Sequence, residues 1–597
     1  MCTNNIYAYM QGKIYSIFSI AHSHKKLNNG PTIYSYLLSR ILPIQCIMEI
    51  DYERGVPNLK QLKIAQIYLI EQFMAEFPEE KIVVFDKEVL IIFNSIIDFA
   101  KFKQYNVSAT FYTNNFQKCQ NKFYLYFVLP TNESILFMNK YRNFLTNGEN
   151  KHIICFVGKR DAKIETNLHH NYIWNYLRVR ELDITMVVCE YDCINMNIHK
   201  SIHKLFIDDD IKTIKHILYC IESIQYLYGE IPEIVSYGNL STKLKDMIIT
   251  ENKINQYPVP TEATISKLII IDRLLDTITP CLTQLTYEGA IDDIVGITNG
   301  QVFIKNRYVP MNSGCPYYQD ARDKSLNVSN ILLESYGNSC SLNLKYYDTD
   351  YDETTLAFLS KAAKKNMEIN KYLQAHVELR SILGKTISNP FWAKLVEIEH
   401  LILKIHKEWD SLALLNETVE NTELRIIDFI DKSITDKKPL CDILGCLCIY
   451  LQIYGKNMSD RGYSTLIEEL ANKYDNSYEI INYMEKLGLM AKKKISIDND
   501  LTFNSFRKIS KKLNLLKKIN INNPSENDLC TICAGYAPIL GKIIEKEKQY
   551  SNNANDPIMV LFVGGCNYSE ISCCRLLGNV IVLTTEIFNK NQFFNSI

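Results

Sequence analysis

Short, almost uninterrupted apolar segments that alternate with amphipathic ones limit most strongly how this chain can fold. Four apolar segments occur before residue 200, within KIVVFDKEVL, FYLYFVLP, KHIICFVGKR and ITMVVCEYD. Strands that are apolar on both faces are typical of parallel sheets covered by helices. Helical spacing follows Asp210, where Ile211, Ile214 and Leu218 begin one apolar face. The pattern predicts an α/β protein with parallel sheets.

The order of these segments along the chain predicts a discontinuous domain. From about residue 354 to 490 the sequence changes to long helical segments with few turn residues. Strand patterns then return in IMVLFVGGCNYSEI and GNVIVLTTE near the C-terminus. A chain of 597 residues is too long for one hydrophobic core. We therefore expect three or more lobes, with one sheet domain completed by the C-terminal strands.

Composition excludes some classes of partner. The net charge is −1 and the isoelectric point is about 6.8, so no global field attracts nucleic acid or anionic lipid. The N-terminal sequence lacks the features of a secretory signal, and no run of apolar residues is long enough to span a bilayer. We expect the 18 cysteines to be reduced, buried thiols of a cytosolic protein.

Residues 271–294, IDRLLDTITPCLTQLTYEGAIDDI, offer the first candidate site. The apolar strand from Leu268 to Ile271 delivers Asp272 and Arg273 at its carboxyl end, where α/β proteins place functional groups. Asp276 and Glu288 are candidates to complete an acid/base set. The alternative, which we favour, is a structural corner. In it Asp272 pairs with Arg273, and a helix starts at Thr279-Pro280, because no nucleophile–base pair lies nearby.

A glycine pair near the C-terminus offers a second candidate. Gly564 and Gly565 follow a strand and precede a helix in GGCNYSE, where backbone amides can hold a phosphate. The segment matches neither nucleotide-binding glycine motif and lacks the lysine of a P-loop. We favour a tight strand-to-helix turn and keep nucleotide binding as the alternative.

Metal and redox motifs are incomplete, so we predict no metal and no cofactor. A lone Cys-x-x-C lacks the second pair of a zinc site, and two histidines at i and i+4 lack the neighbouring glutamate of a metalloprotease. Three alternating aspartates resemble a calcium loop but lack its glycine and glutamate. We expect core thiols, surface histidines and an acidic loop respectively. The residues concerned are Cys530 and Cys533, Cys441, Cys446 and Cys448, His199 and His203, and Asp348, Asp350 and Asp352.

Three motifs resemble those of the Sec/Munc (SM) family, whose members regulate SNARE-driven membrane fusion. They are IIIDRLLDTITPCLTQLTYEGAIDDIVGI, AGYAPIL and VLFVGGCNYSEISCCRLL. The matching residues are Asp272, Arg273, Asp276, Thr279, Pro280, Gln284, Leu285, Thr286, Tyr287, Glu288 and Gly289, then Gly535, Tyr536, Ala537 and Pro538, then Gly564, Gly565, Glu570 and Arg575. We expect their role to be structural.

The resemblance implies an arch of three domains. Two are parallel-sheet α/β domains, the second discontinuous, and a largely helical third domain is inserted in the second. The expected boundaries are 1–145 for domain 1, 146–268 for the first part of domain 2, 269–385 for a SNARE-binding helical hairpin in domain 3a, 386–499 for helical domain 3b, and 500–597 for the second part of domain 2.

The resemblance also implies a non-enzymatic function in vesicle docking and fusion. The motifs are most similar to one branch of the family, whose members are subunits of the HOPS and CORVET tethers of late endosomes, vacuoles and lysosomes. The implied partners are Qa and R SNARE helices and vacuolar protein sorting-associated protein 16. We expect Lys361, Lys364 and Lys365 to meet acidic SNARE residues. The alternatives are a nucleotide-binding enzyme that uses Gly564-Gly565 and an SM protein of another trafficking step.

Overall fold

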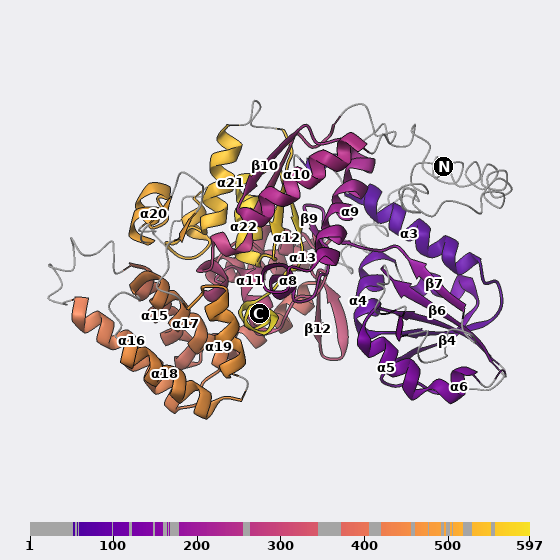
Figure 1. Cartoon of the computed structure of the whole chain (residues 1–597), viewed down its shortest axis with the longest axis horizontal. Helices are drawn as coiled ribbons and strands as arrows, with labels where there is room; N and C mark the ends of the chain where they lie inside the picture. The colour runs from indigo at the N-terminus through magenta and orange to yellow at the C-terminus, as the bar shows by residue number, and fades with distance from the viewer. Residues whose placement is uncertain are drawn as a thin grey trace.

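A computed structural model gives the fold of the chain. It describes residues 52–53, 56–57, 59–97, 99–118, 122–146, 148, 150–158, 164, 166–167, 178–254, 263–343, 372–404, 419–454, 460–475, 477–490, 495–496, 502–503, 506–517, 528–550 and 556–597. Figure 1 shows an arch, with an N-terminal α/β unit at one end, helices at the other and a second sheet between them.

The N-terminal unit is built on a parallel sheet in the order β4-β3-β5-β6-β7. Its strands are β3 (Lys81–Phe85), β4 (Val107–Tyr112), β5 (Phe123–Val128), β6 (Lys151–Val157) and β7 (Arg178–Leu182). Side chains of β5 alternate between two cores, since Leu125 and Phe127 pack in one and Tyr124 and Tyr126 in the other. Both faces of the sheet are therefore covered, as the apolar runs predicted.

Helices complete this unit. They are α4 (Lys87–Ile96), the 3-10 helix η2 (Phe99–Tyr105), α5 (Asn132–Lys140) and α6 (Arg142–Thr146). The strands β1 (Tyr52–Glu53) and β2 (Val56–Pro57) precede α3 (Lys60–Ala75), which joins two cores, since Leu62 packs in the core of the second sheet and Phe73 in that of the first. The helix predicted after Thr131 is confirmed, because the Thr131 hydroxyl accepts a hydrogen bond from the Ser134 amide at the start of α5.

The first sheet extends further along the chain than the sequence predicted. Strands β6 and β7 pair with β5 and with each other, so the sheet ends at Leu182. The expected end of domain 1 at residue 145 is therefore wrong. The apolar pattern identifies β6 as a strand, but only tertiary pairing decides which sheet it joins. The expected boundaries at 268, 385 and 499 stay predictions.

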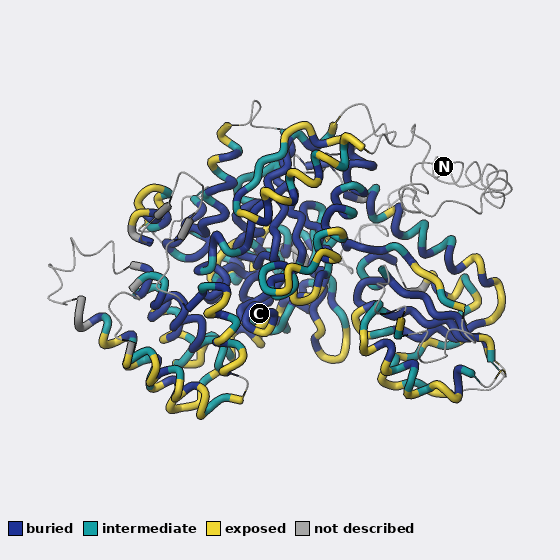
Figure 2. The backbone as a smooth tube through the Cα atoms, in the orientation of Figure 1, coloured by how far each residue is buried: buried dark blue, intermediate teal, exposed yellow. Residues whose placement is uncertain are grey.

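The second sheet has the order β10-β11-β16-β17-β9-β8, with all pairs parallel except β8 with β9. Leu268 of β11 pairs with Met559 of β16, which confirms that C-terminal strands complete this sheet. The strands are β8 (Val187–Glu190), β9 (Cys193–Asn195), β10 (Glu233–Tyr237), β11 (Lys267–Asp272), β16 (Ile558–Val563) and β17 (Val580–Thr584). Figure 2 shows this centre of the molecule as largely buried.

Its helices are α8 (Ser201–Phe206), α9 (Ile211–Tyr228), α10 (Asn239–Ile254), α21 (Ile539–Gln549), α22 (Tyr568–Leu577) and α23 (Lys590–Ser596). Helix α9 begins after Asp210, whose carboxylate accepts hydrogen bonds from the amides of Lys212 and Thr213, as its sequence predicted.

The chain between β11 and α21 is inserted between strands of the second sheet. It contains η3 (Arg273–Leu275), η4 (Thr279–Cys281), α11 (Tyr287–Ile294), the hairpin β12 (Gln301–Ile304) and β13 (Arg307–Pro310), α12 (Pro316–Ala321), α13 (Leu326–Asn343), a helix over 372–387, α15 (Pro390–Lys404), α16 (Val419–Thr435), α17 (Leu440–Tyr454), α18 (Asp460–Lys473), α19 (Ser477–Lys486), β14 (Ile495–Ser496), β15 (Thr502–Phe503), α20 (Phe506–Leu513) and η7 (Leu529–Thr531). The predicted helical insertion is confirmed.

Candidate functional site

Asp272, at the end of β11, fixes the start of helix α10. Its carboxylate accepts hydrogen bonds from the Leu240 amide at 3.0 Å and from the Ser241 amide and hydroxyl at 2.8 and 2.6 Å. Burial raises the pKa of Asp272, while these hydrogen bonds oppose the shift. The expected pairing with Arg273 is wrong, because neighbouring residues at a strand end point in opposite directions.

Arg273 instead forms a buried ion pair with Glu570 of α22. Its Nη1 lies 2.6 Å from Glu570 Oε2, and both side chains are almost fully buried. Two further nitrogens donate to the carbonyl of Asp276. Burial disfavours the charged guanidinium, but Glu570 and Asp276 raise the pKa of Arg273 above its ordinary value. This pair joins the beginning of the insertion to the C-terminal segment.

Asp276 links the Thr279-Pro280 turn to helix α21. Its Oδ1 accepts from the Thr279 amide at 2.9 Å, and its Oδ2 accepts from the Ile539 amide at 2.9 Å. Ile539 follows the Gly535–Pro538 motif directly. Thr279-Pro280 opens only the 3-10 turn η4, and α11 starts later, where the Thr286 hydroxyl accepts from the Gly289 amide. The expected helix start at Thr279 is therefore wrong, because Asp276 and Thr286 each satisfy a separate turn.

The glycine pair forms the tight turn that the sequence favoured. Gly564 and Gly565 have φ of +94° and +90°, in the left-handed region that disfavours other residues. A Cβ on Gly565 would lie 2.6 Å from a Phe588 ring carbon, and one on Gly564 would lie 2.8 Å from Arg273 Cβ. A side chain therefore does not fit at either glycine without a shift of its neighbours.

Backbone amides around the turn already have acceptors within the protein. The Gly564 amide donates to the Thr585 hydroxyl and the Ser569 amide to Gln284 Oε1. Asn567 and Glu570 cap each other at the start of α22. A helix N-terminus binds an anion through its unpaired amides, and here a carboxylate and two amide side chains of the chain itself occupy that position.

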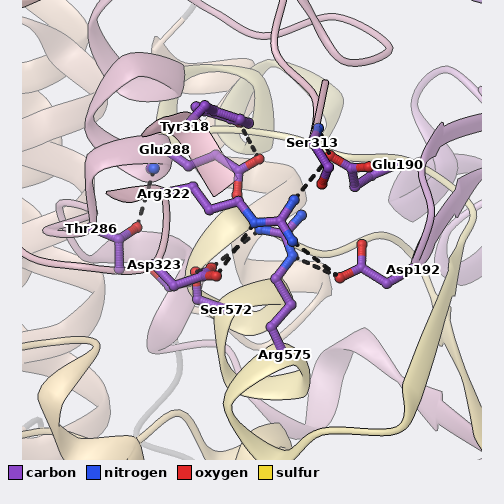
Figure 3. A network of polar contacts seen from close by, with 12 residues as sticks. Glu190, Asp192, Thr286, Glu288, Ser313, Tyr318, Arg322, Asp323, Ser572 and Arg575 are labelled. Carbon is purple, nitrogen blue, oxygen red and sulfur yellow. Dashed lines mark hydrogen bonds and ion pairs between the residues drawn. The ribbon is translucent and has the colours of Figure 1, made fainter. Parts of the chain in front are cut away.

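A second buried network centres on Arg322 and Arg575 (Figure 3). Arg575 Nε lies 2.9 Å from Asp192, and its Nη1 contacts Glu288 and lies 3.2 Å from Asp323. Arg322 Nη1 lies 2.9 Å from Glu190. Burial opposes charging of Arg575, but the surrounding carboxylates raise its pKa. A cavity of about 280 Å³ adjoins this network, and four of its wall residues, Asp192, Arg322, Asp323 and Arg575, form ion pairs with one another.

This second network joins segments that are far apart in the sequence. Glu190 ends β8 and Asp192 lies in the turn to β9, Arg322 and Asp323 follow α12, and Arg575 lies on α22. The sequence analysis identified Glu288 and Arg575 as candidates. It missed Glu190, Asp192, Arg322 and Asp323. No local motif marks these four residues, because their partners are set by the packing of three distant elements.

The structure brings the three sequence motifs into one corner at the second sheet. Arg273 meets Glu570 and Gly565, Asp276 meets the residue after Pro538, and Glu288 meets Arg575. Tyr287 donates to or accepts from His376 Nδ1 at 2.9 Å. Asp276 and Glu288, the expected acid/base candidates, are both buried. Asp276 accepts hydrogen bonds from backbone amides and Glu288 is paired with Arg575, so both carboxylates are engaged within the protein.

The remaining candidates have local explanations. Cys446, Cys448, Cys530 and Cys533 are buried free thiols, and burial raises the pKa of Cys530 to about 12. Cys441 is half-buried. His199 is exposed beside Glu586, whereas His203 is mostly buried against Tyr483, so the surface assignment is wrong for His203. Among the described residues no cluster of three His, Cys, Asp or Glu side chains fits a metal ion. Asp348, Asp350, Asp352, Lys361, Lys364 and Lys365 lie outside the described residues.

Exposed apolar side chains gather on the part of the insertion that follows α11. Phe303 of the β12–β13 hairpin is 55% exposed, Ile331 of α13 68% and Val377 of the helix over 372–387 55%. Salt bridges hold these elements together, since Glu378 contacts Lys305 and Arg307 at the hairpin turn. We call Phe303, Ile331 and Val377 the apolar face.

An ion pair places two of these residues on a common surface of the helix pair. Arg380 of the helix over 372–387 contacts Glu334 of α13 at 3.3 Å. Helical residues three apart share a face, so Val377 lies on the Arg380 side of its helix and Ile331 on the Glu334 side of α13. Each helix therefore exposes an apolar residue, Ile331 or Val377, on the side that carries the Arg380–Glu334 ion pair.

The same arch is found in solved structures of SM proteins. The structure is similar to the SM protein Vps45 in complex with the Qa SNARE Tlg2, with a TM-score of 0.58, 14% identity and coverage of 90% of this chain and 97% of that chain. It is also similar to Unc18 in the Unc18–syntaxin 1 complex from Monosiga brevicollis, with a TM-score of 0.57, 15% identity and coverage of 90% and 98%. The fold is that of SM proteins.

The chain belongs to the Sec1 family, whose sequence profile matches residues 81–551 and 545–596. It is 22% identical to the vacuolar protein-sorting-associated protein 33 homolog of Arabidopsis thaliana over 73% of this chain and 79% of that protein. It is 20% identical to vacuolar protein sorting-associated protein 33A of Rattus norvegicus over 91% and 98%, and 22% identical to human vacuolar protein sorting-associated protein 33B over 90% and 96%. These relatives confirm the resemblance that the three motifs indicated. Within the described residues, no helix combines the length and apolarity needed to cross a bilayer.

Proposed function

We propose that this protein binds SNARE helices and promotes their assembly during vesicle docking and fusion. Its proposed place of action is the late endosome, vacuole or lysosome. The support for this location is that the relatives described above are named for vacuolar protein sorting. Similar folds have been solved with a Qa SNARE and with syntaxin 1. The proposed partners are therefore Qa and R SNARE helices.

The apolar face is the observation that carries this proposal. A SNARE helix is amphipathic, and such a helix binds by laying its apolar residues against apolar side chains on a partner. Val377 and Ile331 supply such side chains on two helices that Arg380 and Glu334 hold together. Phe303 adds an aromatic ring, whose centroid lies 4.9 Å from that of Tyr308 in a tilted arrangement.

Charge substitutions on the apolar face test the proposal. We expect Ile331→Asp with Val377→Asp to weaken binding of a Qa SNARE helix at least tenfold, because each carboxylate would be desolvated at the contact. The matched control is Ile211→Asp, which replaces an isoleucine that is 64% exposed at the first turn of α9. Affinity is measured by calorimetry, and unfolding temperature shows that each variant is folded. Equal SNARE affinity in wild type and the double variant would refute the proposed contact.

We further propose that Lys361, Lys364 and Lys365 meet acidic residues of the SNARE. Changing the three to Glu reverses a local charge of +3, which is expected to weaken SNARE binding and to make it less sensitive to salt. Attachment to the tether is expected to survive. Measuring both affinities on one variant at two salt concentrations distinguishes a local effect from general damage, since equal loss of both would remove this patch from the mechanism.

Attachment to a tether is proposed to use the helical part from 386 to 499. The expected partner is vacuolar protein sorting-associated protein 16, within HOPS or CORVET. Leu424 of α16 is 58% exposed and Tyr478 of α19 is 71% exposed, so this part offers apolar contacts distinct from the apolar face. Leu424→Asp with Tyr478→Asp is expected to abolish co-purification with that partner and to preserve SNARE binding. Retained co-purification would exclude this surface.

We propose that the protein acts without catalysis. The turn at Gly564-Gly565 is filled by Phe588 and Arg273, and its amides donate to protein groups. ATP and GTP are therefore expected to leave the unfolding temperature unchanged. Nucleotide stabilisation that Gly565→Arg abolishes, together with turnover, would instead support the alternative enzyme. Binding only to SNAREs of an earlier secretory step would support the alternative of another trafficking stage.

A further inference from the structure

The N-terminal α/β unit and the second sheet meet along an interface whose centre is apolar. Val187 of β8, a strand of the second sheet, packs into a core of the first sheet, and α4 packs against β8. Helix α3 spans the same boundary, since its residues contribute to cores on both sides. Apolar contacts carry no titratable group, so a response of this interface to pH comes from charged side chains at its edge.

His199 lies at that edge and contacts one carboxylate from each side. Its Nδ1 lies 3.3 Å from Oε1 of Glu586, in the loop that follows β17. Its Nε2 lies 3.9 Å from Oε1 of Glu88, in the first turn of α4. Glu586 belongs to the second sheet domain and Glu88 to the N-terminal unit. The imidazole ring therefore bridges the two units through both of its nitrogens.

The two halves of this bridge differ in how firmly they are held. Glu586 Oε2 accepts a hydrogen bond from the Ser201 amide at 3.1 Å, and only 12% of the Glu586 side chain is exposed. The side chain of Glu88 is 57% exposed and that of His199 is 77% exposed. Glu586 therefore fixes the ring on the side of the second sheet, whereas the contact with Glu88 can open without disturbing either core.

The groups around His199 favour its protonated form. The hydrogen bond with Glu586 raises the pKa of His199 above its ordinary value of 6.5, against the effect of burial. The charges of Glu586 and Glu88 raise this pKa further, and that of Lys204 on α8 lowers it. The other charged residues next to these in the sequence are exposed, and they are Lys87 and Lys200. A protonated imidazole donates from both nitrogens, whereas a neutral one donates from only one. Both carboxylates are therefore attracted to the ring only while it carries its proton.

We propose that His199 is a pH-dependent latch between the N-terminal α/β unit and the second sheet, closed while its ring is protonated. The closed state binds one more proton than the open state, so closure is favoured at low pH. It is lost as pH rises through the pKa of His199, which lies above 6.5. The latch adds to the apolar interface and does not replace it. It acts on the arch itself and does not depend on SNARE binding.

NMR of the His199 ring and hydrogen exchange of the α4 amides together test the latch. The His199 signal, identified by its loss in His199→Gln, is expected to titrate above pH 6.5. Glu88→Gln is expected to lower that pKa, because it removes the carboxylate of the other unit. Exchange in α4, corrected for its intrinsic pH dependence, is expected to be about threefold slower at about pH 6 than at about pH 8, the size of an exposed ion pair. His199→Gln is expected to remove this difference.

Two controls separate the latch from a general effect of charge. Glu80→Gln removes an exposed carboxylate that pairs with Lys122 in the N-terminal unit, and it is expected to change neither the pKa of His199 nor exchange in α4. Lys204→Gln removes the opposing charge and is expected to raise the pKa of His199 further.

Three results would each overturn the latch. The first is a pKa of His199 at or below 6.5. The second is the same pH dependence of α4 exchange in wild type and in His199→Gln. The third is a raised pKa that Glu88→Gln leaves unchanged, since the shift would then come from Glu586 alone and the ring would not join the two units.

Discussion

At the scale of single residues, the Arg273–Glu570 pair is the most deeply buried charge contact of the motif corner. Glu570 Oε1 has no hydrogen-bond partner among the described residues, so its carboxylate depends on Arg273 and on the Asn567 amide. Burial raises the pKa of Glu570, although Arg273 opposes this shift. Removing one partner of a buried pair leaves an uncompensated charge, which costs more than removing both.

Arg273→Met is therefore expected to destabilise the protein by about 3–5 kcal/mol. The double variant Arg273→Met with Glu570→Gln is expected to recover part of that loss, because Gln keeps the hydrogen bond to the Asn567 amide without the charge. Urea unfolding midpoints measure both. Lys122→Met breaks an exposed pair with Glu80 and is expected to cost less than about 1 kcal/mol. A similar midpoint for Arg273→Met and Lys122→Met would contradict the role of the buried pair.

His376 supplies a pH-dependent prediction. Burial lowers its pKa to about 4, so the folded protein keeps this ring neutral while an unfolded chain protonates it near its ordinary value. The unfolded state then binds more protons, and stability falls as pH decreases from about 6.5 to about 4. The expected loss over that range is about 3 kcal/mol.

His376→Gln is expected to reduce this acid sensitivity. Gln keeps a group that can bond to the Tyr287 hydroxyl, which contacts His376 Nδ1 at 2.9 Å, but it cannot titrate. The unfolding temperature of wild type should therefore fall relative to that of the variant as pH decreases from 6.5 to 4, whatever their difference at pH 7. A constant difference between the two proteins across that range would show that His376 does not stay neutral in the folded state.

At the scale of elements, the β16–α22 turn depends on backbone geometry that only glycine provides without strain. Gly565→Ala places a methyl group 2.6 Å from Phe588 and 2.9 Å from the Glu586 carbonyl at φ of +90°. Gly296→Ala is the matched control, since its φ is +89° and no atom lies within 4 Å of the added carbon. The control is expected to cost about 1 kcal/mol and Gly565→Ala several-fold more.

Thermal unfolding of the two glycine variants measures the difference. The two glycines have nearly the same φ, so the backbone strain of an alanine is similar at both positions. The additional loss of stability in Gly565→Ala therefore reports the contact with Phe588 and Glu586. Equal unfolding temperatures would mean that the turn has room for a side chain. In that case the structural argument against phosphate binding at Gly564-Gly565 would fail as well.

At the scale of the whole molecule, the last helix joins the second sheet domain to the helical insertion. Lys590 of α23 lies 2.7 Å from Glu399 of α15 and 3.4 Å from Asp442 of α17. Its Nζ also donates to the Thr283 hydroxyl at 3.0 Å. Burial disfavours its charge, but Glu399 and Asp442 raise the pKa of Lys590, so the ammonium stays charged and paired.

Lys590→Met is expected to loosen the insertion from the sheet domain. Glu399 would remain buried with one fewer partner, and amide hydrogen exchange in α15 and α17 is expected to accelerate at least tenfold. Adding Glu399→Gln is expected to restore part of the protection. The control is Lys394→Met, which removes an exposed pair with Glu397 on the same helix α15. Unchanged exchange in Lys590→Met would mean that apolar packing alone holds the insertion.

Much of the architecture was readable from local sequence, because buried strands and amphipathic helices leave periodic patterns. The apolar runs identified β3, β5, β6, β11, β16 and β17, and Thr131 and Asp210 marked helix starts through their capping side chains. The return of strands after the helical segment predicted the discontinuous sheet. Three motifs predicted the family, and the structure places their residues in one corner.

Pairing over long distances was decided only by the tertiary structure. The apolar sequence of β6 is compatible with either sheet. Its hydrogen bonds to β5 assign it to the first sheet. Asp272 was expected to pair with its neighbour Arg273, but strand geometry sends one to α10 and the other to α22. Glu190, Asp192 and Arg322 carry no local signal, since a charge becomes informative only when burial removes water and its partner is brought close by the fold.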